Sequence, residues 1–171
     1  MPTPARTAPK NGNAGSALTR ALRFEKTGMR YFTSAAQKAT DGFAQRVFAL
    51  LADMERRHYE DIQAIAKKLE EDGKFPVVSA VSSEGRMRLF KREYGRIKKE
   101  KTITGDAAAA MRKALGFEAV GREMYTRMSA KSSNRQEKAF FGILASEEQK
   151  HFDIVYEYLD FLEDSGLRMR E

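Results

Sequence analysis

The sequence predicts an all-α fold, a four-helix bundle made of two helical hairpins joined by a long crossover that contains a short extra helix. Apolar residues recur at three- and four-residue steps in four long segments, which is the spacing of amphipathic helices. Turn signals separate the first segment from the second and the third from the fourth. The second half of the chain repeats key positions of the first half at a constant offset of 93 residues, from 25 to 118, 55 to 148 and 58 to 151.

The first predicted hairpin begins at Ser16, a plausible helix N-cap. Its first helix runs to about Thr40, and the turn Asp41-Gly42 leads into a second helix over residues 43–71. Gly73 ends that helix in the position that favours glycine. The two apolar stripes are Leu18, Ala21, Leu22, Glu25, Gly28 and Phe32, and Val47, Leu51, Glu55, His58, Ile62, Ile65 and Leu69.

The crossover covers residues 74–104, with its extra helix at about residues 83–99. The second hairpin then has one helix from near residue 104 to Lys131 and another over residues 135–163, which Gly166 stops. Two hairpins joined by a long crossover make a known four-helix-bundle topology. The apolar stripes are Met111, Ala114, Leu115, Glu118, Gly121, Tyr125 and Met128, and Phe141, Leu144, Glu148, His151, Val155, Leu159 and Leu162.

The composition is that of one helix-rich domain without cysteine. The 171 residues are 42% hydrophobic and 32% charged, and the absence of cysteine excludes disulfides, iron–sulfur clusters and a thiolate iron site. No apolar run reaches the ~18 residues that span a bilayer, and no secretory signal is present, so we expect a cytoplasmic protein without a membrane partner. We expect residues 1–15 to be a disordered tail, 16–166 the bundle and 167–171 a C-terminal tail.

The net charge of +7 leaves an anionic partner open. The densest basic stretch, Arg86 to Lys101, contains only Phe90 and Tyr94 as aromatic residues, which are too few for a base-stacking platform. We therefore interpret most basic residues as solvated helix faces and do not expect nucleic acid as the partner. A basic RNA-interacting bundle remains an alternative that this stretch motivates.

Glutamate and histidine residues interrupt the apolar stripes in a duplicated pattern. The chain has only two histidines, each three residues after a glutamate, and another glutamate stands 30 residues before each of these pairs. Positions i and i+3 share a helix face, so each pair can reach one centre. The candidate metal ligands are Glu25, Glu55, His58, Glu118, Glu148 and His151.

The spacing from the turns puts these ligands at one level of the bundle. At ~1.5 Å per residue, Glu25 lies ~24 Å before the turn at Asp41, and Glu55 lies ~21 Å after it. In the second hairpin, Glu118 and Glu148 each lie ~22 Å from the turn at residue 133. Both hairpins therefore place their ligands near the middle of the bundle.

Four ionised carboxylates inside an apolar bundle are strongly unfavourable unless positive charge or protons compensate them. Two divalent cations balance four carboxylates. Mixed oxygen and nitrogen ligands suit iron or manganese better than calcium or structural zinc. A surface salt-bridge explanation would need these residues on polar faces, where they do not lie. The pattern predicts two Fe ions, with Mn or a mixed Fe/Mn pair also compatible.

Four segments that contain the ligands, residues 24–28, 51–58, 117–121 and 144–151, resemble the rubrerythrin-type branch of the ferritin-like di-iron proteins. The resemblance extends over about residues 17–164. It implies a ferritin-like bundle and identifies Tyr125 with a family tyrosine that hydrogen-bonds near the site, so we take it as the candidate catalytic side chain. By the same similarity, Glu25 and Glu118 are terminal ligands, Glu55 and Glu148 bridge the irons, and His58 and His151 each cap one iron.

The chain departs from this family at three points. Gly121 stands where peroxidase-active rubrerythrins have an additional glutamate, which lets one iron change ligands during peroxide turnover. Phe32 is the first-half counterpart of Tyr125. The rubredoxin domain that delivers electrons is also missing. The remaining six-ligand centre is closer in ligand count to a bacterioferritin ferroxidase site. These departures weaken the expectation of peroxidase turnover of the rubrerythrin kind.

The leading functional hypothesis is a di-iron redox protein that reacts ferrous pairs with hydrogen peroxide or O2, for oxidant detoxification or iron oxidation. Electrons would come from an external electron donor or from ferrous iron itself. The alternative is an iron-binding or storage protein without peroxidase turnover. We expect a homodimer, since such bundles often pair along helix faces.

Overall fold

The computed structural model describes residues 12–78, 88, 91–92 and 105–168. These ranges are almost entirely helical and contain no strand, which confirms the predicted all-α class. Most of the predicted crossover helix at about residues 83–99, and most of the basic stretch 86–101, lie outside the described residues. The four long helices are α1 (Gly12–Lys38), α2 (Gly42–Asp72), α4 (Gly105–Lys131) and α5 (Arg135–Arg168).

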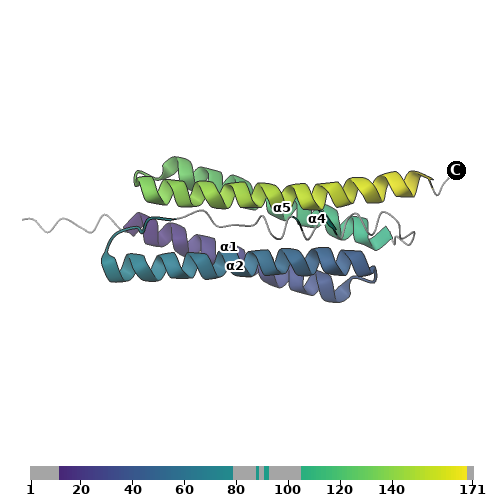
Figure 1. The fold of residues 1–171 in the computed structure, drawn as a ribbon, viewed down its shortest axis with the longest axis horizontal. Helices are drawn as coiled ribbons and strands as arrows, with labels where there is room; N and C mark the ends of the chain where they lie inside the picture. Colours follow the sequence, from purple (N-terminus) through teal and green to yellow (C-terminus); the bar gives the residue numbers. More distant parts are fainter. Residues whose placement is uncertain (1–11, 79–87, 89–90, 93–104, 169–171) are drawn as a thin grey trace, which may run out of the picture.

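The helices pair as two hairpins that lie alongside each other, α1 with α2 and α4 with α5 (Figure 1). The hairpins meet through α1 against α4 and α2 against α5. This arrangement within one chain is consistent with the predicted four-helix bundle. None of the helices in the described ranges combines the length and apolar character that crossing a membrane requires.

Side-chain caps begin α2 and α5, and a glycine ends α2. Asp41 Oδ1 accepts a hydrogen bond of 2.7 Å from the Ala44 N–H at the start of α2. Asn134 Oδ1 accepts hydrogen bonds of 2.8 and 3.0 Å from the first N–H groups of α5. Gly73 has φ 63° and ends α2 by donating its N–H to the Leu69 carbonyl at 3.0 Å. Asp41, Asn134 and Gly73 therefore satisfy backbone groups that helix ends leave unpaired.

Two predicted helix ends are wrong. The first helix begins at Gly12 instead of Ser16, because Ala14 is buried against the core and tertiary packing extends the helix. Gly166 does not stop the last helix, which continues to Arg168. A single glycine costs a helix only about 1 kcal/mol, which an already formed helix tolerates.

The buried side chains form two apolar clusters, one on each side of the ligand level along the bundle. The predicted apolar stripes are confirmed, since most of their members are buried. The first cluster, on the side of the Asp41 turn, includes Phe32, Val47, Phe48, Leu51, Met111, Val155, Tyr158 and Leu162. The second, on the side of Asn134, includes Leu18, Ala21, Ile62, Leu69, Tyr125, Met128, Phe141 and Leu144.

The Asp41→Ala variant should lose more stability than Asn134→Ala. Removing an N-cap costs about 1 kcal/mol. Asp41 Oδ1 additionally accepts a hydrogen bond of 3.3 Å from the Tyr158 hydroxyl, which ties the first turn to α5. Urea unfolding measures the free energy of unfolding of both variants. An equal or smaller loss in Asp41→Ala would contradict the double role of this side chain.

Candidate metal centre

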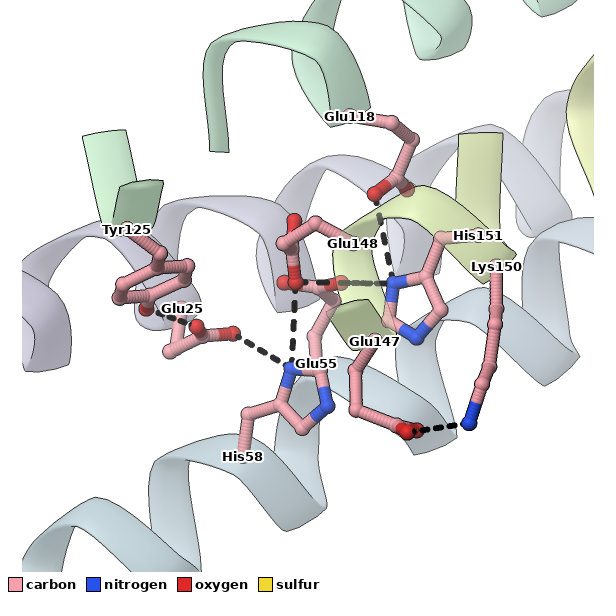
Figure 2. A network of polar contacts seen from close by, with 9 residues as sticks. All are labelled: Glu25, Glu55, His58, Glu118, Tyr125, Glu147, Glu148, Lys150 and His151. Carbon is pink, nitrogen blue, oxygen red and sulfur yellow. Dashed lines mark hydrogen bonds and ion pairs between the residues drawn. The ribbon is translucent and has the colours of Figure 1, made fainter. Parts of the chain in front are cut away.

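The structure brings all six predicted ligand residues into one buried cluster in the middle of the bundle (Figure 2). Each helix contributes from its core-facing stripe, so the cluster interrupts the apolar interior at a single level. None of these six residues is more than 3% exposed. The contributions are Glu25 from α1, Glu55 and His58 from α2, Glu118 from α4, and Glu148 and His151 from α5.

Each imidazole faces carboxylates from both hairpins. His58 Nδ1 lies 3.5 Å from Glu25 Oε2 and 3.3 Å from Glu148 Oε1. His151 Nδ1 lies 3.1 Å from Glu55 Oε1 and 3.3 Å from Glu118 Oε2. The two imidazole rings stack, with centroids 5.1 Å apart and an interplanar angle of 9°. The Nδ1 atoms therefore point into the same small volume as the carboxylate oxygens.

The donor set of this cluster fits metal ions. One ligand atom from each of Glu55, His58, Glu148 and His151 lies within 4.8 Å of the others. Among the described residues, each of the four ligand glutamates has at least one buried oxygen without a hydrogen-bond partner. The Nδ1 atoms of both histidines are also buried and without a hydrogen-bond partner. Buried polar atoms normally have partners, and divalent cations would supply them here. Four carboxylates and two imidazoles could bind a di-iron site.

Two glycines make room for Glu55 and Glu148 and let α1 pack closely against α4. A Cβ at Gly28 would lie 2.7 Å from Glu55 Oε2 and 2.7 Å from a ring carbon of Phe117. A Cβ at Gly121 would collide with Glu148 Oε2 and lie 2.7 Å from a ring carbon of Phe24. Each glycine thus accommodates a carboxylate of its own hairpin and a phenylalanine of the other. The two phenylalanine rings stack with centroids 4.5 Å apart.

Tyr125 makes the two halves of the site unequal. Its hydroxyl, on α4, donates a short hydrogen bond to Glu25 Oε1 on α1. Phe32, at the equivalent place in the first half, is fully buried and has no hydroxyl to offer Glu118. Burial and the neighbouring Glu25 carboxylate raise the pKa of Tyr125 well above its ordinary value, so the phenol remains protonated and acts as a donor.

Burial and mutual repulsion make the metal-free cluster hold protons. Burial raises the pKa of Glu118 and of Glu148 to about 8. Burial, with the charges of Glu25 and other carboxylates, raises the pKa of Glu55 well above its usual range. Burial lowers the pKa of His151 to about 4. Cations that bind here displace these protons, so their affinity increases with pH.

The pair formed by Glu25 and His58 behaves differently. Burial by itself would raise the pKa of Glu25, but the adjacent His58 outweighs burial and lowers it. Burial by itself would lower the pKa of His58, but the Glu25 and Glu148 carboxylates outweigh burial and raise it well above its usual value. The first half of the metal-free site therefore resembles an ion pair.

Glu147 is a buried acidic residue of this region that the sequence analysis missed. It is 3% exposed, and its Oε1 lies 2.6 Å from Lys150 Nζ. A signal was available in the sequence, because Glu147 stands three residues after Leu144 and four before His151, which is the spacing of the buried stripe. Its first-half counterpart at the 93-residue offset is the apolar Met54.

Replacing Gly121 by alanine should damage the site, whereas replacing Gly116 should not. The added methyl of Gly121→Ala meets Glu148 and Phe24, and overpacking of this kind costs about 1–3 kcal/mol of stability. Nothing lies within 4 Å of a Cβ at Gly116, so Gly116→Ala should stabilise the same helix by roughly 0.5–1 kcal/mol. Urea unfolding and calorimetric titration with Co(II) measure stability and binding. Unchanged Co(II) affinity in Gly121→Ala would contradict the glycine's role.

The metal-free protein should become less stable as pH rises from 6.5 to 8. Glu55, Glu118, Glu148 and His58 have folded-state pKa values raised above their ordinary values. Such groups contribute stability that is lost as pH rises through the folded pKa. The lowered pKa of His151 acts below pH 6.5, outside this window.

Melting temperatures measured across this range check the sign. The decrease should be absent from protein loaded with Zn(II), because the cations replace the protons. A melting temperature that rises with pH in the metal-free protein would contradict the assignment of raised pKa values.

Comparison with known proteins gives the family. Residues 16–100, about half of the chain, match the family model described as Rubrerythrin. This range contains Glu25, Glu55 and His58, the contribution of the first hairpin to the cluster. Searches of the curated proteins and of the solved structures found no match. The matched residues belong to the rubrerythrin family, which is consistent with a rubrerythrin-type ferritin-like protein.

Proposed function

We propose that the protein is a di-iron redox protein that reacts ferrous pairs with hydrogen peroxide or O2. The buried cluster of four glutamates and two histidines carries this proposal, because it needs compensating cations and offers them mixed oxygen and nitrogen ligands. The rubrerythrin family match supports iron as the metal. The roles that follow are oxidant detoxification, iron oxidation, or both.

The distances suggest how the residues would share two ions. Glu25 with His58 would hold one ion and Glu118 with His151 the other, since these pairs are 3.5 and 3.3 Å apart. Glu55 and Glu148 would bridge, because each lies near the imidazole of the opposite hairpin. Bound as a ferrous pair, the metal supplies two electrons, which with two protons reduce one hydrogen peroxide to two water molecules.

The chain's own residues would control access and protonation. The apolar clusters on both sides of the ligand level exclude bulk water and keep the carboxylates in place. Tyr125 holds Glu25 through Oε1, so that Oε2 remains directed toward His58. Its hydroxyl also keeps a proton inside the site. An external electron donor, or further ferrous iron, would return the centre to its reduced state.

The second candidate function is iron oxidation or storage without peroxidase turnover. Gly121 favours this function over peroxidase turnover of the rubrerythrin kind. The space beside this glycine is taken by the Glu148 carboxylate and the Phe24 ring. Among the described residues, no additional carboxylate lies beside Gly121 for an iron to exchange ligands, so the six-ligand set would stay fixed. Light scattering tests the alternative, since assembly into a large cage favours storage and a dimer favours the redox role.

Removing a ligand should abolish the oxidised centre. We expect anaerobic titration of the wild type to bind two Fe(II) per chain, and hydrogen peroxide or O2 to produce the absorption bands of an oxidised di-iron centre. His58→Ala and Glu148→Gln should lose the bands, because each removes a group that faces the other hairpin's ligands. Glu163→Gln, in an exposed pair with Arg112, is the control and should retain them. Bands that persist in either ligand variant would refute the ligand assignment.

A further inference from the structure

Glu147 is a buried carboxylate that the ligand set does not use. It precedes Glu148 on α5, is 3% exposed and is held by Lys150, whose Nζ lies 2.6 Å from Oε1. Its second oxygen, Oε2, is buried without a hydrogen-bond partner among the described residues. Burying a carboxylate is costly, so a second interaction of this group is to be expected.

The other nitrogen of His151 is the matching unpaired atom. Its Nδ1 faces Glu55 and Glu118, whereas Nε2 is also buried and has no hydrogen-bond partner among the described residues. Figure 2 shows this Nε2 pointing away from Glu118, toward the side of the cluster where the Glu147–Lys150 pair lies.

A histidine that binds a metal through one nitrogen carries its proton on the other. Donating that N–H to a carboxylate, directly or through one water, fixes the tautomer and makes the imidazole a better ligand. We propose that Glu147, anchored by Lys150, is a positioning residue that keeps the proton of His151 on Nε2 and so leaves Nδ1 for the metal. This inference rests on the proposed function of the centre.

At the positions equivalent to Glu147 and Lys150, the first half of the molecule has no carboxylate. Met54, the counterpart of Glu147, is buried but cannot accept a strong hydrogen bond. Arg57, the counterpart of Lys150, is 53% exposed and lies 3.7 Å from Asp53 on the surface. Among the described residues, a carboxylate as buried as Glu147 therefore stands only behind the His151 imidazole, because Asp61, which interacts with His58 from the same helix, is only half-buried. The metal position at His151 should bind more tightly than the position at His58.

The tautomer can be read directly by NMR because the chain contains only two histidines. In the full-length protein labelled with 15N-histidine, metal-free and loaded with Zn(II), we expect His151 to show a protected Nε2 proton. Glu147→Met, which copies the first half, should lose that signal and leave the His58 signals unchanged. An identical His151 spectrum in Glu147→Met and the wild type would overturn the proposal.

Metal affinity gives an independent test of the proposed role of Glu147. Competition with a chromophoric chelator should show that Glu147→Met weakens one of two Zn(II) sites about 10-fold, the size typical of lost partners behind a ligand. Glu147→Gln keeps the shape and an acceptor oxygen, so it should retain the tautomer and lose less affinity. Glu123→Gln, which removes an exposed Glu–Arg pair on α4, is the control and should change nothing.

The outcomes separate this inference from the proposed function. A wild type that binds no pair of metal ions refutes the proposed function, while the metal-free spectra still decide whether Glu147 sets the His151 tautomer. If Glu147→Met does not fold, Glu147→Gln decides, and an unchanged Zn(II) affinity in that variant overturns the proposal. Circular dichroism and melting temperature establish that each variant is folded.

Discussion

Four carboxylates and two imidazoles buried among apolar side chains form the interaction on which the rest of the molecule depends. Such a group is electrostatically unfavourable unless protons or cations compensate the charge. Without metal, this constraint raises the pKa values of Glu55, Glu118 and Glu148, so these carboxyl groups hold protons more tightly. A folded bundle that buries this cluster is therefore a bundle built to bind positive charge.

Local packing holds the carboxylates in place, because each hairpin packs a phenylalanine against a glycine of the other hairpin. Phe24 of the first hairpin packs on Gly121 of the second, and Phe117 packs on Gly28. Because a glycine in a helix costs about 1 kcal/mol relative to alanine, its presence at both places reflects the close approach of a ring and a carboxylate. The approximate two-fold symmetry of the core is thus a consequence of a repeated sequence that must build two similar half-sites.

The symmetry is broken where polar groups surround the ligands. Tyr125 donates to Glu25, whereas Phe32 offers nothing to the second half. Glu147 lies behind the second half, whereas Met54 lies behind the first. The ligand types are the same on both sides, but their hydrogen-bonding surroundings differ. The two halves of the candidate site are therefore chemically unequal, although their ligand types are the same.

The sequence by itself determined the helical class, the core stripes and the six candidate ligands, because helix periodicity is a local property of the chain and the 93-residue repeat is visible in the order of its residues. Helix ends were less predictable: Ser16 and Gly166 carry local signals that burial of Ala14 and continuation of α5 override. Only the tertiary structure decided that Glu147 is buried beside the site and that Gly28 and Gly121 receive rings from the other hairpin. The contacts of the two glycines join residues far apart in sequence, and their existence depends on how closely two helices approach.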